Sequence, residues 1–139
     1  MRYPLDELLD KRSIIQLKIE RIDDDKEKDR LKREFKDYSE AIIDYVNEGI
    51  CNMQQVKTWH QELYEANGKT WDLEARIRRG QIGDLSLEEI GKTAIAIRES
   101  NGIRVGIKSK IVQTTGTGYE DIKINHASQN SLNDYKSKP

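Results

Sequence analysis

Polar side chains recur at helical spacing in two stretches of the chain, and their types could support chemistry. In the first stretch four of them lie four, three and four residues apart: Asn67, Trp71, Glu74 and Arg78. In the second stretch the steps are three, three and four: Arg98, Asn101, Arg104 and Lys108. Residues three or four apart share one face of an α-helix, so each set forms a polar row.

Two interpretations of these rows stay open. In the structural one, Glu74 pairs with an arginine of the second row, and the asparagines fix the register between two helices. In the functional one, Arg98, Arg104 and Lys108 bind a phosphate or carboxylate, with Trp71 as a wall of the pocket. A catalytic variant of this pocket would use Glu74 as acid or base and Arg98 and Arg104 as anion clamps.

Apolar periodicity and capping signals predict that both rows lie on long helices. The best-marked start is a capping box at residues 86–89, which opens a helix that continues to about Gln113. The preceding helix is expected over residues 54–80, and Gly68 predicts either a kink or a division into two abutting helices. The short turn at 81–85 makes these two helices antiparallel neighbours.

Two more helices are predicted in the first fifty residues. The first begins at Tyr3-Pro4 and runs to about Ile22, and residues 23–25 break it and cap the second. The second helix ends at Gly49. Its apolar positions alternate in steps of four and three, as in a helical hairpin: Leu31, Phe35, Tyr38, Ile42 and Tyr45.

The expected fold is all-α, an antiparallel four-helix bundle with a long N-terminal helical hairpin and a short extended C-terminal tail. Residues 1–125 form a single helical domain, and residues 126–139 form a flexible polar tail. A content of 35% hydrophobic and 35% charged residues suits helices with one buried stripe. On the fourth helix Gly91, Gly102 and Gly106 leave one face bare, which favours close packing by another helix.

Composition excludes several classes of function. A net charge of −1 gives no basic surface for nucleic acid. The single cysteine, Cys51, indicates a reducing compartment, and the absence of an apolar leader or membrane span predicts a cytoplasmic protein. No spacing typical of a metal or phosphate site is present, so neither a metal nor a cofactor is expected. His60 lies on an apolar stripe and is interpreted as a core histidine.

Part of the chain resembles a known group of proteins. The segments are ANGKTWDLEARIRRG, EEIGKTAIAIRESNGIRVGIKSKI and EDIKINHAS, within about residues 63–128. They resemble small uncharacterised helical proteins of bacterial surface-polysaccharide gene clusters. The matching positions are Asn67, Trp71, Leu73, Glu74, Arg78, Arg98, Asn101 and Arg104. The resemblance implies a setting in surface-glycan or nucleotide-sugar metabolism, without a mechanism.

A minor alternative comes from chorismate mutases, which small all-α chains with inward arginines, a lysine and a glutamate resemble. The first helix, LDELLDKRSIIQLKIERI, lacks the arginine and isoleucine-aspartate repeat of that family. The sequence therefore favours a non-enzymatic interaction or accessory protein that forms a homo-oligomer, such as a dimer, or binds a partner helix. Recognition of an anionic sugar nucleotide or phosphate is a further expectation, and a small all-α enzyme is the alternative.

Overall fold

The computed structural model describes residues 2–81, 83 and 85–118, and their regular structure consists of four α-helices. The helices are α1 (Leu5–Arg21), α2 (Asp25–Asn47), α3 (Met53–Gln81) and α4 (Leu87–Thr115). No strand occurs among these residues, so the predicted all-α helical bundle is confirmed. The predicted extended segment and the polar tail at 126–139 lie outside the described residues.

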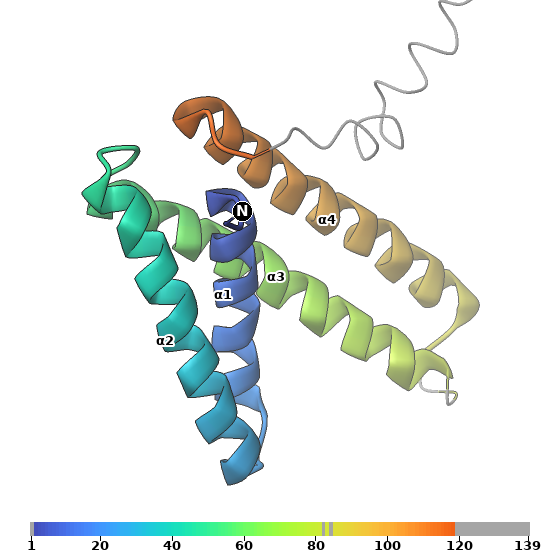
Figure 1. The fold of residues 1–139 in the computed structure, drawn as a ribbon. Helices are drawn as coiled ribbons and strands as arrows, with labels where there is room; N and C mark the ends of the chain where they lie inside the picture. Colours follow the sequence, from blue (N-terminus) through green and yellow to red (C-terminus); the bar gives the residue numbers. More distant parts are fainter. Residues whose placement is uncertain (1, 82, 84, 119–139) are drawn as a thin grey trace, which may run out of the picture.

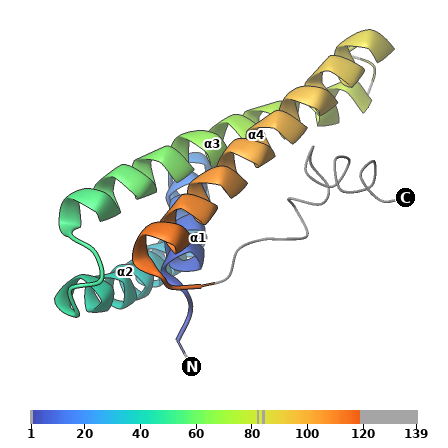
Figure 2. The same ribbon diagram turned by 90° about the horizontal axis from the view of Figure 1, so that it is seen from above.

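The bundle is built from two antiparallel hairpins that cross. α1 and α2 form one hairpin and α3 and α4 form the other (Figure 1). α1 packs against all three other helices, so it is the central element. Seen from above, the turn end of the α3–α4 hairpin projects well beyond α1 and α2 (Figure 2). We call this projecting part, residues 73–81 of α3 and 87–97 of α4, the arm.

Helix ends follow the predicted capping signals. The Asp24 side chain accepts hydrogen bonds from the backbone N–H groups of Lys26 and Glu27 at the start of α2. Ser86 Oγ accepts from the Glu89 N–H at 3.1 Å and caps α4. Each cap satisfies donors that the first turn of a helix leaves free.

Of the two alternatives at Gly68, the division into two abutting helices is wrong, because α3 runs as one helix from Met53 to Gln81. Gly68 instead faces α1. A Cβ atom at this position would lie 3.4 Å from Leu17 Cδ2 and 3.7 Å from Arg21 Nη2. The missing side chain lets α1 lie directly on α3, and this packing offsets the low helix propensity of glycine.

One hydrophobic core joins all four helices where the hairpins cross. Its largest fully buried side chains include Leu5 and Leu9 of α1, Leu63 of α3 and Ile111 of α4. Trp59 is also in this core. The core occupies the crossing and does not extend along the arm, where Leu73 and Ile77 are only partly buried.

The expected packing on the glycine face of α4 is not made within the chain. Gly91, Gly102 and Gly106 are exposed, and a Cβ at any of them would meet nothing within 4 Å. On the same side Ile95 is 57% and Ile103 is 56% exposed. The apolar stripe did not identify the buried face because apolar and polar residues are mixed on most sides of α4.

Candidate functional site

An ion pair between α1 and α4 lies at the centre of the polar residues. Arg104 donates from Nε to Asp10 Oδ1 at 3.0 Å and from Nη2 to Asp10 Oδ2 at 2.8 Å. The Asp10 side chain is 3% exposed and that of Arg104 is 32% exposed. The guanidinium thus grips a buried carboxylate with two parallel hydrogen bonds, the strongest geometry for this pair.

α3 joins the same network through Asn67. Its Nδ2 donates to Asp10 Oδ1 and to Ser13 Oγ, both at 2.9 Å. Ser13 Oγ in turn donates to the backbone carbonyl of Asp10 at 2.7 Å. Three helices therefore meet at one carboxylate. Several charge-assisted and neutral hydrogen bonds compensate for the burial of this carboxylate.

The prediction that Glu74 pairs with an arginine of the second row is therefore wrong. Glu74 has an exposed side chain on the arm, and the acid that holds Arg104 is Asp10 of α1. α1 packs against both α3 and α4, so its acid reaches Arg104 at the side of the second hairpin. A signal was present in the sequence: Asp6, Asp10 and Ser13 occur in steps of four and three on the buried side of α1.

Five of the eight predicted site residues line one depression beside this network. Its volume is about 210 Å³, and Ile14, Leu17 and Thr70 complete the lining. The five are Asn67, Trp71, Glu74, Asn101 and Arg104. The structure thus brings together the amide, indole and carboxylate groups of the predicted pocket with one of its cations.

The other three predicted residues lie elsewhere. Lys108 donates to Glu7 Oε1 at 2.6 Å, which forms a second ion pair between α4 and α1. Arg78 and Arg98 are exposed and are not part of the lining of the depression. The predicted cluster of three cations around one anion is therefore not assembled, since only Arg104 faces the depression and its guanidinium grips Asp10.

A buried acid lies close to the Lys108–Glu7 pair. Asp6 is 4% exposed, and its Oδ1 has no hydrogen-bond partner among the residues that the structure describes. Burial raises the pKa of Asp6 to about 6, with a further increase from Glu7, while the charge of Lys108 acts in the opposite direction. Burial disfavours the charged form of a carboxyl, so Asp6 is a weak point of the folded state at neutral pH.

His60 is held by polar partners from α1. Arg12 Nε donates to His60 Nδ1 at 3.1 Å, and Nε2 lies 2.6 Å from Gln16 Oε1. Since Nδ1 accepts a hydrogen bond, the ring is neutral and Nε2 is the donor. Burial, with a smaller effect of the Arg12 charge, lowers the pKa of His60 to about 4. His60 is a satisfied structural histidine, as predicted.

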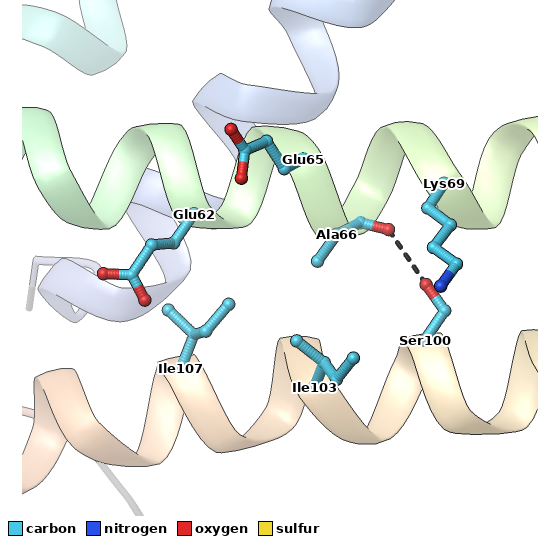
Figure 3. A pocket seen from close by; sticks show the side chains of 7 residues that line it. All are labelled: Glu62, Glu65, Ala66, Lys69, Ser100, Ile103 and Ile107. Atoms are coloured by element: carbon cyan, nitrogen blue, oxygen red, sulfur yellow. Dashed lines mark hydrogen bonds between the residues drawn. The ribbon is translucent and has the colours of Figure 1, made fainter.

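α3 and α4 approach closely through small polar side chains. The hydroxyls of Thr70 and Ser100 are 2.7 Å apart. Ser100 also donates to the carbonyl of Ala66 at 3.1 Å (Figure 3). Next to this contact a groove of about 350 Å³ opens between the two helices. Its lining combines apolar and charged side chains: Glu62, Glu65, Ala66, Lys69, Ser100, Ile103 and Ile107. We call this the α3–α4 groove.

The described part of the chain has neither a candidate metal cluster nor a membrane-spanning helix. Across residues 2–81, 83 and 85–118, no group of three or more His, Cys, Asp or Glu side chains is placed to hold a metal ion. Nor is any of the described helices apolar over a stretch long enough to cross a bilayer.

The fold and the site together define a four-helix protein with crossed hairpins, a central buried ion pair and an open groove on its second hairpin. No family model, curated protein or solved structure matches the chain.

Proposed function

We propose that this chain is a non-enzymatic interaction protein that docks a helix on the outer face of its α3–α4 hairpin. The observation that carries the proposal is the position of Ile103. Its side chain is more than half exposed and lies at the edge of the α3–α4 groove (Figure 3). An exposed isoleucine beside a concave, partly apolar groove is the arrangement that receives an amphipathic helix.

The state of the charged side chains supports this function over catalysis. Arg104 and Lys108 are paired with acids of α1, and His60 is enclosed by Arg12 and Gln16. General acid–base chemistry needs a titratable group that can reach a substrate near its working pKa. A histidine with a pKa of about 4 inside a hydrogen-bonded cluster is poorly suited to that role.

The arm leaves further apolar surface of α4 open. On α4 the side chains of Ile90 and Ile97 are only partly buried, and Leu87 is 88% exposed. A pair of helices buries one stripe of each and leaves the flanks of that stripe open, whereas a third or fourth helix closes the core. These side chains lie on another side of α4 than Ile103, so a helix docked at the α3–α4 groove would leave them uncovered.

The cellular and metabolic setting of the protein is part of the proposal too. A cytoplasmic protein that assists surface-polysaccharide or nucleotide-sugar metabolism is what the sequence resemblance implies, and the resemblance alone supports it. The proposed role is therefore that of an accessory protein, which holds a partner through helix packing.

Site-specific photocrosslinking in cells of the source organism tests this function. A photoreactive amino acid replaces Ile103, and in a matched control it replaces Ile43, which is 43% exposed on α2. We expect a discrete crosslinked species from position 103 and none from position 43. Absence of an adduct at 103, or equal adducts from both positions, would refute docking on the α3–α4 face.

A second candidate function is recognition of a small anionic ligand, a sugar nucleotide or phosphate. It is favoured by one observation, the depression in which Trp71, Asn101 and Arg104 meet. An anion there would compete with Asp10 for the Arg104 guanidinium, so the neutral groups would have to supply much of the specificity. In the enzymatic version Glu74 would act as acid or base.

A thermal-shift screen with sugar nucleotides, sugar phosphates and dicarboxylates distinguishes this candidate. A ligand that binds only the folded state raises Tm by mass action. The informative variant is Asn101→Ala, which lines the depression but leaves the Asp10–Arg104 pair in place. A shift in the wild type that is lost in this variant would support a ligand site, and a turnover lost in Glu74→Gln would support the enzyme.

A further inference from the structure

We propose that the partner helix is α4 of a second copy of this chain, docked antiparallel about a two-fold axis midway between Ile103 and Gly106. The inference rests on the proposed function for the use of this face. It adds the identity of the partner, its direction and its register.

The first observation is that an exposed side chain, Ile103, and a position without a side chain, Gly106, occur close together on α4. Ile103 projects from α4 with 56% of its surface exposed, whereas at Gly106 an added Cβ would meet nothing within 4 Å. In an antiparallel pair centred between them, Ile103 of each copy lies over Gly106 of the other. A side chain that packs onto bare backbone lets two helix axes approach closely.

The second observation is the symmetric placement of two charges. Glu99 lies four residues before Ile103, and Lys110 lies four residues after Gly106. Eleven residues are close to three helical turns, so both charges lie on one side of α4, separated by roughly 16 Å. Both side chains are exposed, and neither makes a salt bridge to another residue of the described ranges.

These charges select a second copy and its direction. In the antiparallel register each Glu99 lies opposite Lys110 of the other copy, so the pairing occurs twice. A parallel pair would instead place Glu99 opposite Glu99 and Lys110 opposite Lys110, which is repulsive. A surface patch that complements itself under a two-fold rotation is what an isologous dimer requires.

The α3–α4 groove gives the second copy a concave seat. Ile103 and Ile107 form the α4 wall of the groove, and Ala66 contributes to its floor (Figure 3). A helix laid against α4 on this side would also contact α3, which widens the contact beyond a single helix pair. A contact made by one pair of helices and the edge of a groove corresponds to a small interface, so we expect a dissociation constant in the micromolar range.

The first experiment is sedimentation equilibrium of the purified full-length chain from about 1 to 500 μM. This range brackets a micromolar dissociation constant. We expect a monomer–dimer equilibrium. Ile103→Ser should weaken it at least about tenfold, since a buried isoleucine contributes that much to association. Ile43→Ser removes a similarly exposed isoleucine from α2 and should leave the dissociation constant unchanged.

The second experiment tests the direction and register of the helix pair by charge reversal. Glu99→Lys alone and Lys110→Glu alone each turn two attractive pairs into two repulsive ones, and each should weaken the dimer several-fold. The double variant Glu99→Lys/Lys110→Glu restores opposite charges at both positions and should return the dissociation constant to near the wild-type value. Nonspecific association through α4 would not restore the dissociation constant in the double variant.

Three results would overturn the inference: a monomer at all concentrations, a dimer insensitive to Ile103→Ser, or a double variant as weak as the two single effects combined. Failure here is distinguishable from failure of the proposed function. A monomer in solution together with a specific adduct at position 103 in cells would leave docking intact and assign the face to another protein. Absence of both would remove the proposed function itself.

Discussion

Arg104 of α4 grips Asp10 of α1 with hydrogen bonds of 3.0 and 2.8 Å, across 94 residues of sequence. The pair connects the two hairpins at the point where they cross, and Asn67 attaches α3 to the same carboxylate. It therefore fixes how the hairpins sit on each other, in addition to any contribution to stability.

Removing either member of this pair should destabilise the fold strongly. Asp10→Ala leaves a half-buried guanidinium without its acid, and Arg104→Ala leaves a buried carboxylate without its cation. We expect a loss of about 3 kcal/mol or more in the free energy of unfolding for each, measured by urea denaturation. Arg98→Ala, an exposed arginine on the same helix, serves as control and should change stability by less than about 0.5 kcal/mol. Equal effects at 98 and 104 would contradict the structural role of the pair.

Neutralising Asp6 should stabilise the protein at pH 7. The folded-state pKa is raised from 3.8 to about 6, so the folded state binds this proton more tightly than the unfolded state does. The stability contributed by protonated Asp6 is therefore present below about pH 4 and is lost as pH rises to 6. Asp6→Asn should raise the free energy of unfolding by about 2 kcal/mol at pH 7, with little difference at pH 3.5.

The matched control for Asp6 is Asp29→Asn, an exposed acid on α2. Denaturation curves recorded at pH 3.5 and pH 7 compare both variants with the wild type. A gain that is the same at both values of pH would show that the effect is not the burial of a charge.

His60 should give the opposite pH dependence. Its pKa is lowered from 6.5 to about 4, so the unfolded chain takes up the proton first on acidification. The stability that neutral His60 supports is present above about pH 6.5 and is lost as pH falls towards 4. Histidine proton resonances followed by NMR titration measure the pKa directly, and His60→Gln should reduce this acid sensitivity. A pKa near 6.5 would mean that the ring is not enclosed by Arg12 and Gln16.

Glycine substitutions on α4 should differ in sign according to backbone conformation. Gly106→Ala places a methyl group in open space inside a helix and should stabilise the monomer by about 0.5–1 kcal/mol. Gly116→Ala also meets nothing within 4 Å, but its φ of +69° is unfavourable for alanine, so this variant should be less stable than the wild type. Thermal unfolding at low protein concentration separates these effects from any association, and a stabilising Gly116→Ala would contradict the left-handed cap.

Much of the fold was predictable because its signals are local. Asp24 and Ser86 cap the helices they were expected to open, and Gly49 has a φ of +77° just past the end of α2. Such caps depend on hydrogen bonds between residues two or three apart, so a single stretch of sequence contains all the necessary information. The antiparallel arrangement of α3 and α4 followed from a turn too short for any other path.

The site was predictable only in part. Asn67, Trp71, Glu74, Asn101 and Arg104 do line one depression, because residues on one face of neighbouring antiparallel helices meet. Their partners were not predictable in the same way. The acid that binds Arg104 comes from α1, and no local pattern states how one hairpin crosses another.

By itself, the sequence determined four helices, their ends and the residues that share a face, since these depend on period and on contacts within one turn. Tertiary structure alone decided which face of α4 is buried. Apolar and polar residues are mixed on most sides of α4, so its own pattern could not choose between Ile107, which is packed against α1 and α3, and Ile103, which is exposed. That choice was made by the crossing of α1, which covers one side of the second hairpin and leaves the other open.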